Sequence, residues 1–251
     1  MSFFRKSNEE IVLRYASGIQ SEIYGEDHFL LEFDSSFFED EFVLKKTFKP
    51  CMPSLLHAYI EHSLVLNTQE VLCECGDVVR DDIADELRLF DIPLRELNTF
   101  SDEDSYERYL SAVYCENVPK KLTPDIFEVL FNRRTIMKKF NETIASQIQK
   151  LSYARWNEYL TSDGVMLRCS YWPEGLKRAL FRREQGHCAI CLRDLRNLIA
   201  NDEAYQIDHI IPIKIGGSND PTNFQILCSE CNKTKGGNGT DTSSFYSPLF
   251  K

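Results

Sequence analysis

Two Cys-x-x-Cys pairs constrain this chain more than any other feature of its sequence. They are Cys188-Ala189-Ile190-Cys191 and Cys228-Ser229-Glu230-Cys231. The short spacing lets one tight turn aim both thiolates at a single ion, and two such turns complete the tetrahedral shell of a structural zinc. Four thiolates leave no open coordination position, so this zinc is predicted to stabilise the fold and not to act as a catalyst. Unrelated buried thiols are the alternative, which the matched spacing disfavours.

The 36 residues between the two pairs contain polar residues set in a strand, loop and strand pattern. We expect a first strand that ends at Asp208 and His209, a loop, a second strand, and a short helix that begins near Ser229. Asn232 then lies at the start of that helix. A carboxylate and an amide oxygen that converge from two elements suit a hard cation. Asp208 and Asn232 therefore predict a site for Mg²⁺ or Mn²⁺.

The same motifs, in this order, resemble the HNH endonuclease family. The resemblance rests on Asp208-His209-Ile210-Ile211-Pro212, the Gly216-Gly217 loop, Asn223 before an apolar strand, and the run from Cys228 through Asn232 to Lys235. It covers about residues 174–236 and implies an active site built from a β-hairpin and a helix around one metal ion. By this resemblance His209 is the general base, Asp208 is a metal ligand, and Asn223 braces the hairpin loop and orients His209. Asn232 stands in place of the final His, which makes this an HNN variant.

The resemblance implies that the chain hydrolyses phosphodiester bonds. Neutral His209 would take a proton from water, and the ion on Asp208 and Asn232 would stabilise charge on the phosphorane and the leaving 3' oxygen. DNA is the expected substrate, and RNA stays open. Residues expected to contact the phosphate backbone are Lys214, Lys233, Lys235, Arg182 and Arg183, with a solvated surface as the alternative. The alternative function is an inactive zinc module that binds nucleic acid or protein.

The first 165 or so residues predict a mostly helical domain. A Ser-x-x-Glu capping box at residues 7–10 precedes an apolar run. After Thr123-Pro124, apolar residues recur at three- and four-residue steps up to Leu151, which predicts one amphipathic helix. The short apolar stretches 29–33 and 70–75 fit either a strand or a helix.

A further helix is expected to begin at Pro173-Glu174. Its residues Leu176 and Leu180 are predicted to face inward, and Arg182 and Arg183 to be turned away from them. The fold class is therefore α+β. We expect a helical domain over residues 1–165, a small zinc-stapled ββα-metal nuclease domain over residues 170–240, and a tail over residues 241–251.

Charge is divided unevenly between these parts. Residues 1–170 carry 19 Lys and Arg against 30 Asp and Glu, a net of −11, whereas residues 171–251 carry 10 against 9, a net of +1. Because an acidic surface repels DNA, we expect the amino-terminal domain to dock a protein partner, such as an ATPase or a DNA-recognition subunit, that brings the substrate. The layout is similar to nuclease components of bacterial anti-phage or restriction systems. A stand-alone repair or recombination nuclease is the alternative.

The sequence predicts a cytoplasmic protein. No apolar run approaches the roughly 18 to 20 residues of a membrane helix, and the start of the chain turns charged before a signal peptide could form. Nine cysteines without a secretion signal indicate reduced thiols or metal ligands.

Overall fold

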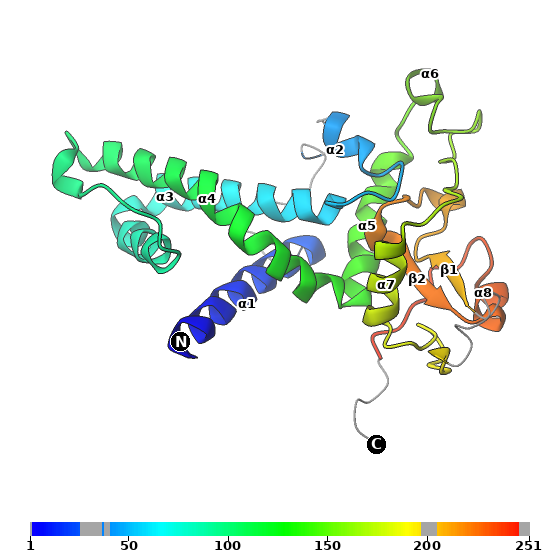
Figure 1. Ribbon diagram of the computed structural model, residues 1–251. Coiled ribbons are helices and arrows are strands. Elements are labelled where there is room, and N and C mark those ends of the chain that lie inside the picture. Colours follow the sequence, from blue (N-terminus) through cyan, green and yellow to red (C-terminus); the bar gives the residue numbers. More distant parts are fainter. Residues whose placement is uncertain (1, 26–36, 38–40, 197–204, 246–251) are drawn as a thin grey trace. The chain divides into compact units, whose positions relative to one another are not determined.

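The structure is a computed structural model that describes residues 2–25, 37, 41–196 and 205–245 (Figure 1). The chain forms two compact units, one from Met1–Glu32 with Leu56–Val129 and the other from Phe33–Leu55 with Leu130–Lys251. The α+β class is confirmed, because helices dominate and two short strands form a small sheet near the carboxyl end. Among the described helices, none is long and apolar enough to cross a membrane. The division into functional domains near residue 165 stays a prediction.

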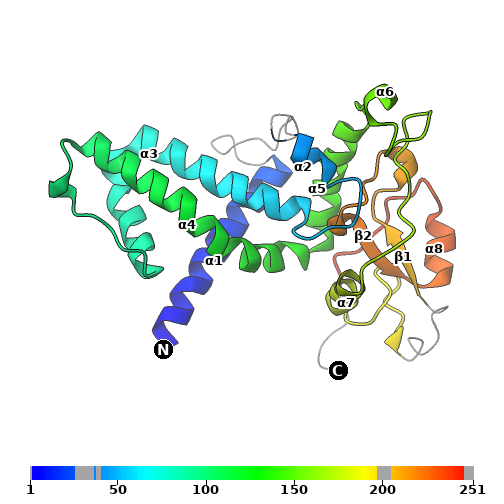
Figure 2. The ribbon, with the colours of Figure 1, turned by 45° about the horizontal axis from the view of Figure 1, so that its top comes forward.

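The first unit is a packed set of long helices. They are α1 (Ser2–Tyr24), α3 (Leu55–Leu89) and α4 (Glu103–Phe131), with the short 3-10 helix η2 (Leu97–Thr99) before α4. Helices α3 and α4 lie side by side in Figures 1 and 2 and run in opposite directions, since His57 stacks on Phe127 while Arg80 pairs with Glu103 at 2.8 Å. Helix α1 is anchored by buried Glu22, whose carboxylate accepts hydrogen bonds from three side chains of α3.

Several local expectations for this region were wrong. The capping box at residues 7–10 does not begin a helix, because α1 begins at Ser2 and runs through it. Pro124 does not begin one either, since it lies together with Pro119 inside α4. Apolar residues buried on both sides of these prolines hold the helix together despite the missing backbone hydrogen bonds. The expected single helix is therefore two, because α4 ends at Phe131 before a second helix begins.

The structure decides between strand and helix for one of the two short apolar stretches that fit both. Residues 70–75 are helical and lie in α3, which is kinked at Cys75. Residues 29–33 lie outside the described part of the chain.

The second unit holds the sheet and its flanking helices. Its elements are α2 (Glu41–Lys45), α5 (Arg134–Ile148), α6 (Tyr153–Trp156), α7 (Glu174–Arg183), β1 (Gln206–His209), η4 (Ile213–Ile215), η5 (Pro221–Asn223), β2 (Phe224–Leu227) and α8 (Ser229–Lys235). Strands β1 and β2 are antiparallel, with Asp208 opposite Gln225 and His209 opposite Phe224. Figures 1 and 2 show the sheet between α7 and α8. The predicted order of strand, loop, strand and helix from Ser229 is confirmed.

A buried ionic network joins α5, α7 and β2. Glu184, directly after α7, pairs with Arg134 of α5 and with Arg183 at 2.7 Å. Arg183 also donates a hydrogen bond to the carbonyl of Phe224 at 2.5 Å, and its guanidinium lies over the ring of Phe131. Arg183 therefore faces the core, contrary to the sequence prediction. Its burial removes it from the residues able to contact a phosphate.

Candidate active site

Four cysteine sulfurs meet at one point beside the sheet. The Sγ atoms of Cys188, Cys191, Cys228 and Cys231 all lie within 4.8 Å of one another. A zinc ion with Zn–S bonds of about 2.3 Å has sulfur–sulfur edges of about 3.8 Å. The distance from Cys191 Sγ to Cys228 Sγ is 3.8 Å, and Cys228 Sγ also accepts the N–H of Cys231 at the start of α8. The donor set fits one structural zinc ion.

A polar cavity of about 410 Å³ opens beside the end of β1. The side chains of Asp208 and His209 from β1 and of Asn232 from α8 all line it. Two exposed basic residues, Arg168 and Lys214, line it as well. The fold thus brings together three of the residues that the sequence indicated. It adds Arg168, which the sequence did not indicate because this residue lies before the recognisable motifs.

His209 is buried and held in one orientation by Asn219. The amide nitrogen of Asn219 donates to the carbonyls of Phe48, at 2.9 Å, and Leu167, at 2.8 Å. Because carbonyl oxygens only accept, these bonds fix the orientation of the amide and leave its Oδ1 facing His209 Nε2 at 3.1 Å. Nε2 therefore carries the proton and Nδ1 is the unprotonated nitrogen. Within the described part of the chain, no hydrogen bond reaches Nδ1.

The environment of His209 keeps its ring neutral. Burial is the largest cause and lowers the pKa of His209 to about 4. The positive charge of Arg168 acts in the same direction, whereas the contact with Asn219 opposes it. Since the imidazolium form is disfavoured, His209 is in its basic form at neutral pH.

Asp208 has one carboxylate oxygen engaged by the protein. Its Oδ2 accepts hydrogen bonds from Gln225 at 3.1 Å and from the ammonium of Lys235 at 2.9 Å. Lys235 also donates to the carbonyl of His209 at 2.7 Å and is only 6% exposed. Lys235 is therefore a buried partner of Asp208, and the expectation that it contacts phosphate was wrong. Among the described residues, none hydrogen-bonds to Asp208 Oδ1, which leaves this oxygen able to meet an ion.

Asn223 ties the two ends of the loop between the strands. Its Oδ1 accepts the N–H of Ile211 at 2.8 Å, and its Nδ2 donates to the carbonyls of Ile211 and Ser218, both at 2.9 Å. The loop closes so tightly that a Cβ at Gly217 would lie 1.9 Å from the carbonyl oxygen of Ile211. A glycine is required at this close approach.

Segments far away in the sequence hold the same loop from outside. The N–H of Asn219 donates to Thr47 at 2.8 Å, and Asp220 accepts the N–H of Leu55 at 2.7 Å. Asn141 of α5 donates to the hydroxyl of Thr222 at 3.0 Å. The position of the loop thus depends on residues 47–55 and on α5 as well as on the hairpin.

The remaining basic candidates lie at the surface. Lys214, Lys233 and Arg182 are all exposed, and of these Lys214 lines the cavity that holds His209. Their placement leaves them accessible to a ligand.

The antiparallel hairpin and α8 around a polar cavity, with a four-cysteine cluster that fits a zinc ion, define a small ββα domain. Residues 188–238 match the family model described as HNH endonuclease, so this segment is an HNH domain. The match begins at Cys188 and does not extend into the helical region before it. Searches of curated proteins and of solved structures gave no match to the chain. The family indicates a nuclease that handles nucleic acid.

Proposed function

We propose that the chain is a metal-dependent endonuclease that hydrolyses phosphodiester bonds in DNA. The observation that carries this proposal is the cavity in which neutral His209, Asp208 and Asn232 lie together. Each supplies what phosphodiester hydrolysis needs, namely a base and oxygen ligands for a cation.

His209 is the proposed general base. Its unprotonated Nδ1 accepts a proton from the water that attacks phosphorus, a step that contributes roughly 10² to 10⁴ in rate. Asn219 Oδ1 holds the Nε2–H and stabilises the imidazolium that forms when Nδ1 is protonated. Asn223 supports the step indirectly, because it keeps the loop that carries Asn219 closed.

The free Oδ1 of Asp208 and the amide oxygen of Asn232 are the proposed ligands of Mg²⁺ or Mn²⁺. Both are hard oxygen donors, which these ions prefer over softer ligands. When bound, the ion supplies stabilisation of the negative charge that develops on the phosphate. Lys235 holds the other oxygen of Asp208, so the carboxylate cannot rotate freely.

Arg168 and Lys214 are the proposed phosphate contacts within the cavity. Both are exposed cations that line it beside His209. Lys233 and Arg182 remain candidates for contacts further along the strand. Such contacts position a substrate without reading its sequence.

The acidic character of residues 1–170 supports a wider proposal. Because this net charge of −11 opposes free binding of DNA, a protein partner would bring the substrate, as in an anti-phage or restriction system. A cytoplasmic location fits nine cysteines that form no disulfide, four of them grouped as zinc ligands. A stand-alone repair nuclease is the competing role.

Cleavage of supercoiled plasmid by the zinc-loaded full chain tests this function. We expect slow, partner-free nicking in Mg²⁺ or Mn²⁺, none without a divalent ion, and products with a 3' hydroxyl and a 5' phosphate. Rapid cutting by the chain alone would contradict the need for a partner. No cutting of plasmid or single-stranded DNA in either ion would contradict the enzyme and favour a binding module.

A further inference from the structure

A second cavity of about 410 Å³ shares Arg168 with the candidate active site. Phe48, Tyr159 and Tyr171 line it, and all of them lie outside the segment that matches the HNH family. The cavity is therefore a feature of the framework around the HNH domain.

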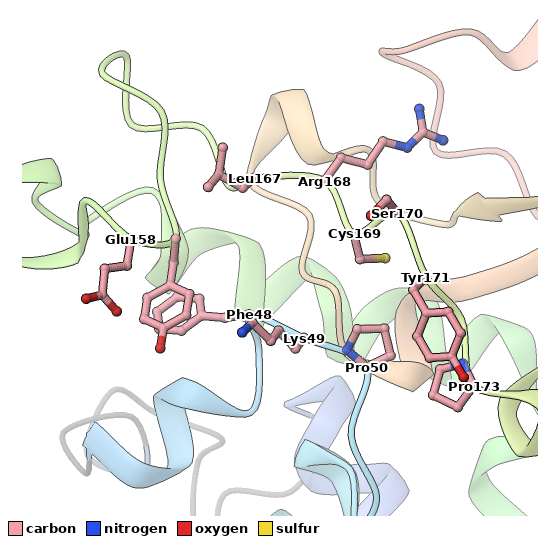
Figure 3. Close-up of a pocket in the computed structure, with 11 residues that line it drawn as sticks. Phe48, Lys49, Pro50, Glu158, Leu167, Arg168, Cys169, Ser170, Tyr171 and Pro173 are labelled. Atoms are coloured by element: carbon pink, nitrogen blue, oxygen red, sulfur yellow. The ribbon is translucent and has the colours of Figure 1, made fainter.

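Residues 167–171 form one wall of this cavity, and Arg168 among them also lines the candidate active site. Figure 3 shows Arg168 pointing to one side of this extended segment and Cys169 and Tyr171 pointing to the other. This is the alternation that an extended backbone gives. Asn219 fixes the segment, because its side chain binds the carbonyl of Leu167 and the N–H of Cys169. The same amide that orients His209 thus also holds the wall of the second cavity.

Three aromatic rings lie in the lining of this cavity. Tyr159 stacks on Phe48 with ring centroids 4.2 Å apart and planes at 10°, and Phe48 itself is buried. Tyr171 is 70% exposed, although the protein ordinarily covers much of the surface of a tyrosine side chain. Burial raises the pKa of the Cys169 thiol to about 11, so this side chain is a neutral part of the wall.

Three charged residues, Lys49, Glu158 and Arg168, line the same cavity. The Nζ atom of Lys49 lies 6.0 Å from the centre of the Tyr159 ring, and Arg168 also lines the candidate active site. Both can hold phosphates at the edge of the cavity. Glu158 also lines it. A carboxylate repels a phosphate but accepts a hydrogen bond from the exocyclic amino group of a base.

We propose that this cavity binds an unpaired base of the DNA strand whose phosphate lies at Arg168. The inference rests on the proposed nuclease function and specifies its substrate as DNA with a single-stranded segment next to the cleaved bond. Aromatic rings stack on bases of any sequence, and the volume of the cavity is that of a small-ligand site. A base in a duplex is already stacked and paired, and it would have to leave the helix to enter.

Binding of short labelled DNA to the full chain, without divalent ions and at fixed salt, tests the inference. The probes are a single-stranded 12-mer, the same 12-mer as a duplex, and a 12-mer of abasic sites that keeps only the backbone. We expect Tyr171→Ala to weaken binding of the single strand roughly five- to hundredfold. The abasic probe should bind weakly to wild type and variant alike. Tyr171→Phe keeps the stacking ring and should bind like wild type.

Tyr153→Ala is the matched control, because Tyr153 is an exposed tyrosine of α6 that does not line the cavity. It should leave binding unchanged. Equal affinity for the single-stranded and abasic probes, or no effect of Tyr171→Ala, would overturn the inference. If binding depends on the base but no DNA is ever cut, the nuclease proposal fails instead.

Discussion

The candidate zinc site and the loop that carries Asn219 lie in one HNH domain but are held in different ways. The zinc site consists of two local turns whose four thiols converge on one point. The loop of residues 210–223 is closed from inside by Asn223 and is also held by partners outside the domain, in residues 47–55, 141 and 167–169. A zinc ion bound at the four thiols would therefore secure the hairpin, whereas contacts from residues 47–55, 141 and 167–169 help to set the geometry of His209.

The largest effect should come from the zinc site. Cys228→Ser removes a buried thiolate, and we expect the protein to lose its zinc and the HNH domain to unfold, because structural zinc contributes roughly 10–16 kcal/mol in zinc-finger peptides. Metal analysis and circular dichroism measure both changes. Cys73→Ser, at an exposed cysteine of α3, should change neither. Full zinc occupancy in Cys228→Ser would show that the cluster is not the ligand set.

Asn219→Ala should separate the loop from the zinc site. The change leaves the carbonyls of Phe48 and Leu167 without their donor and frees His209 Nε2, at a cost of roughly 3 kcal/mol in unfolding free energy. Zinc content should stay at the wild-type level while cleavage falls. Asn157→Ala, at an exposed residue of the same unit, is the control for chemical denaturation. Unchanged stability and cleavage would mean that the framework does not set the site.

Lys235→Met tests the buried partner of Asp208. Residues that orient a metal ligand typically contribute about 10- to 100-fold to metal affinity or activity, and we expect a loss of this size in cleavage. Lys233→Met, two residues away and exposed, should cost much less. If the two variants lose activity equally, Lys235 acts only through its general positive charge.

A smaller and more local test concerns protonation. Because burial lowers the pKa of His209 to about 4, nitrogen NMR should show a neutral, Nε2-protonated ring from pH 7 down to about pH 5. A titration midpoint near the ordinary value of about 6.5 would contradict the buried, Asn219-bound state.

Local patterns in the sequence predicted most of the HNH domain. The zinc thiols, the hairpin and the start of α8 follow from short spacings and turn residues, and these determine structure within a few residues. The contacts of Asn223 join residues only 5 and 12 positions apart, so they too lie within the motif.

The sequence failed where a residue's role depends on distant partners. Arg183 and Lys235 are charged residues of the kind that usually lie at the surface. Arg183 is instead buried against Glu184 and the carbonyl of Phe224. Lys235 is buried against Asp208 and the carbonyl of His209. No local sequence pattern marks the role of Asn219, because the carbonyls that it binds come from segments about 50 and 170 positions earlier. In α4 the apolar contacts on both sides of Pro124 outweigh the local tendency of proline to end a helix.

If His209 activates the attacking water, as proposed, the initial rate of DNA cleavage by His209→Ala relative to wild type measures that role. Both proteins are assayed in Mg²⁺ and in Mn²⁺ after their zinc content and thermal unfolding have been matched. Loss of the general base should lower the rate at least about a hundredfold. Equal rates in two folded, zinc-loaded proteins would show that His209 is not the base.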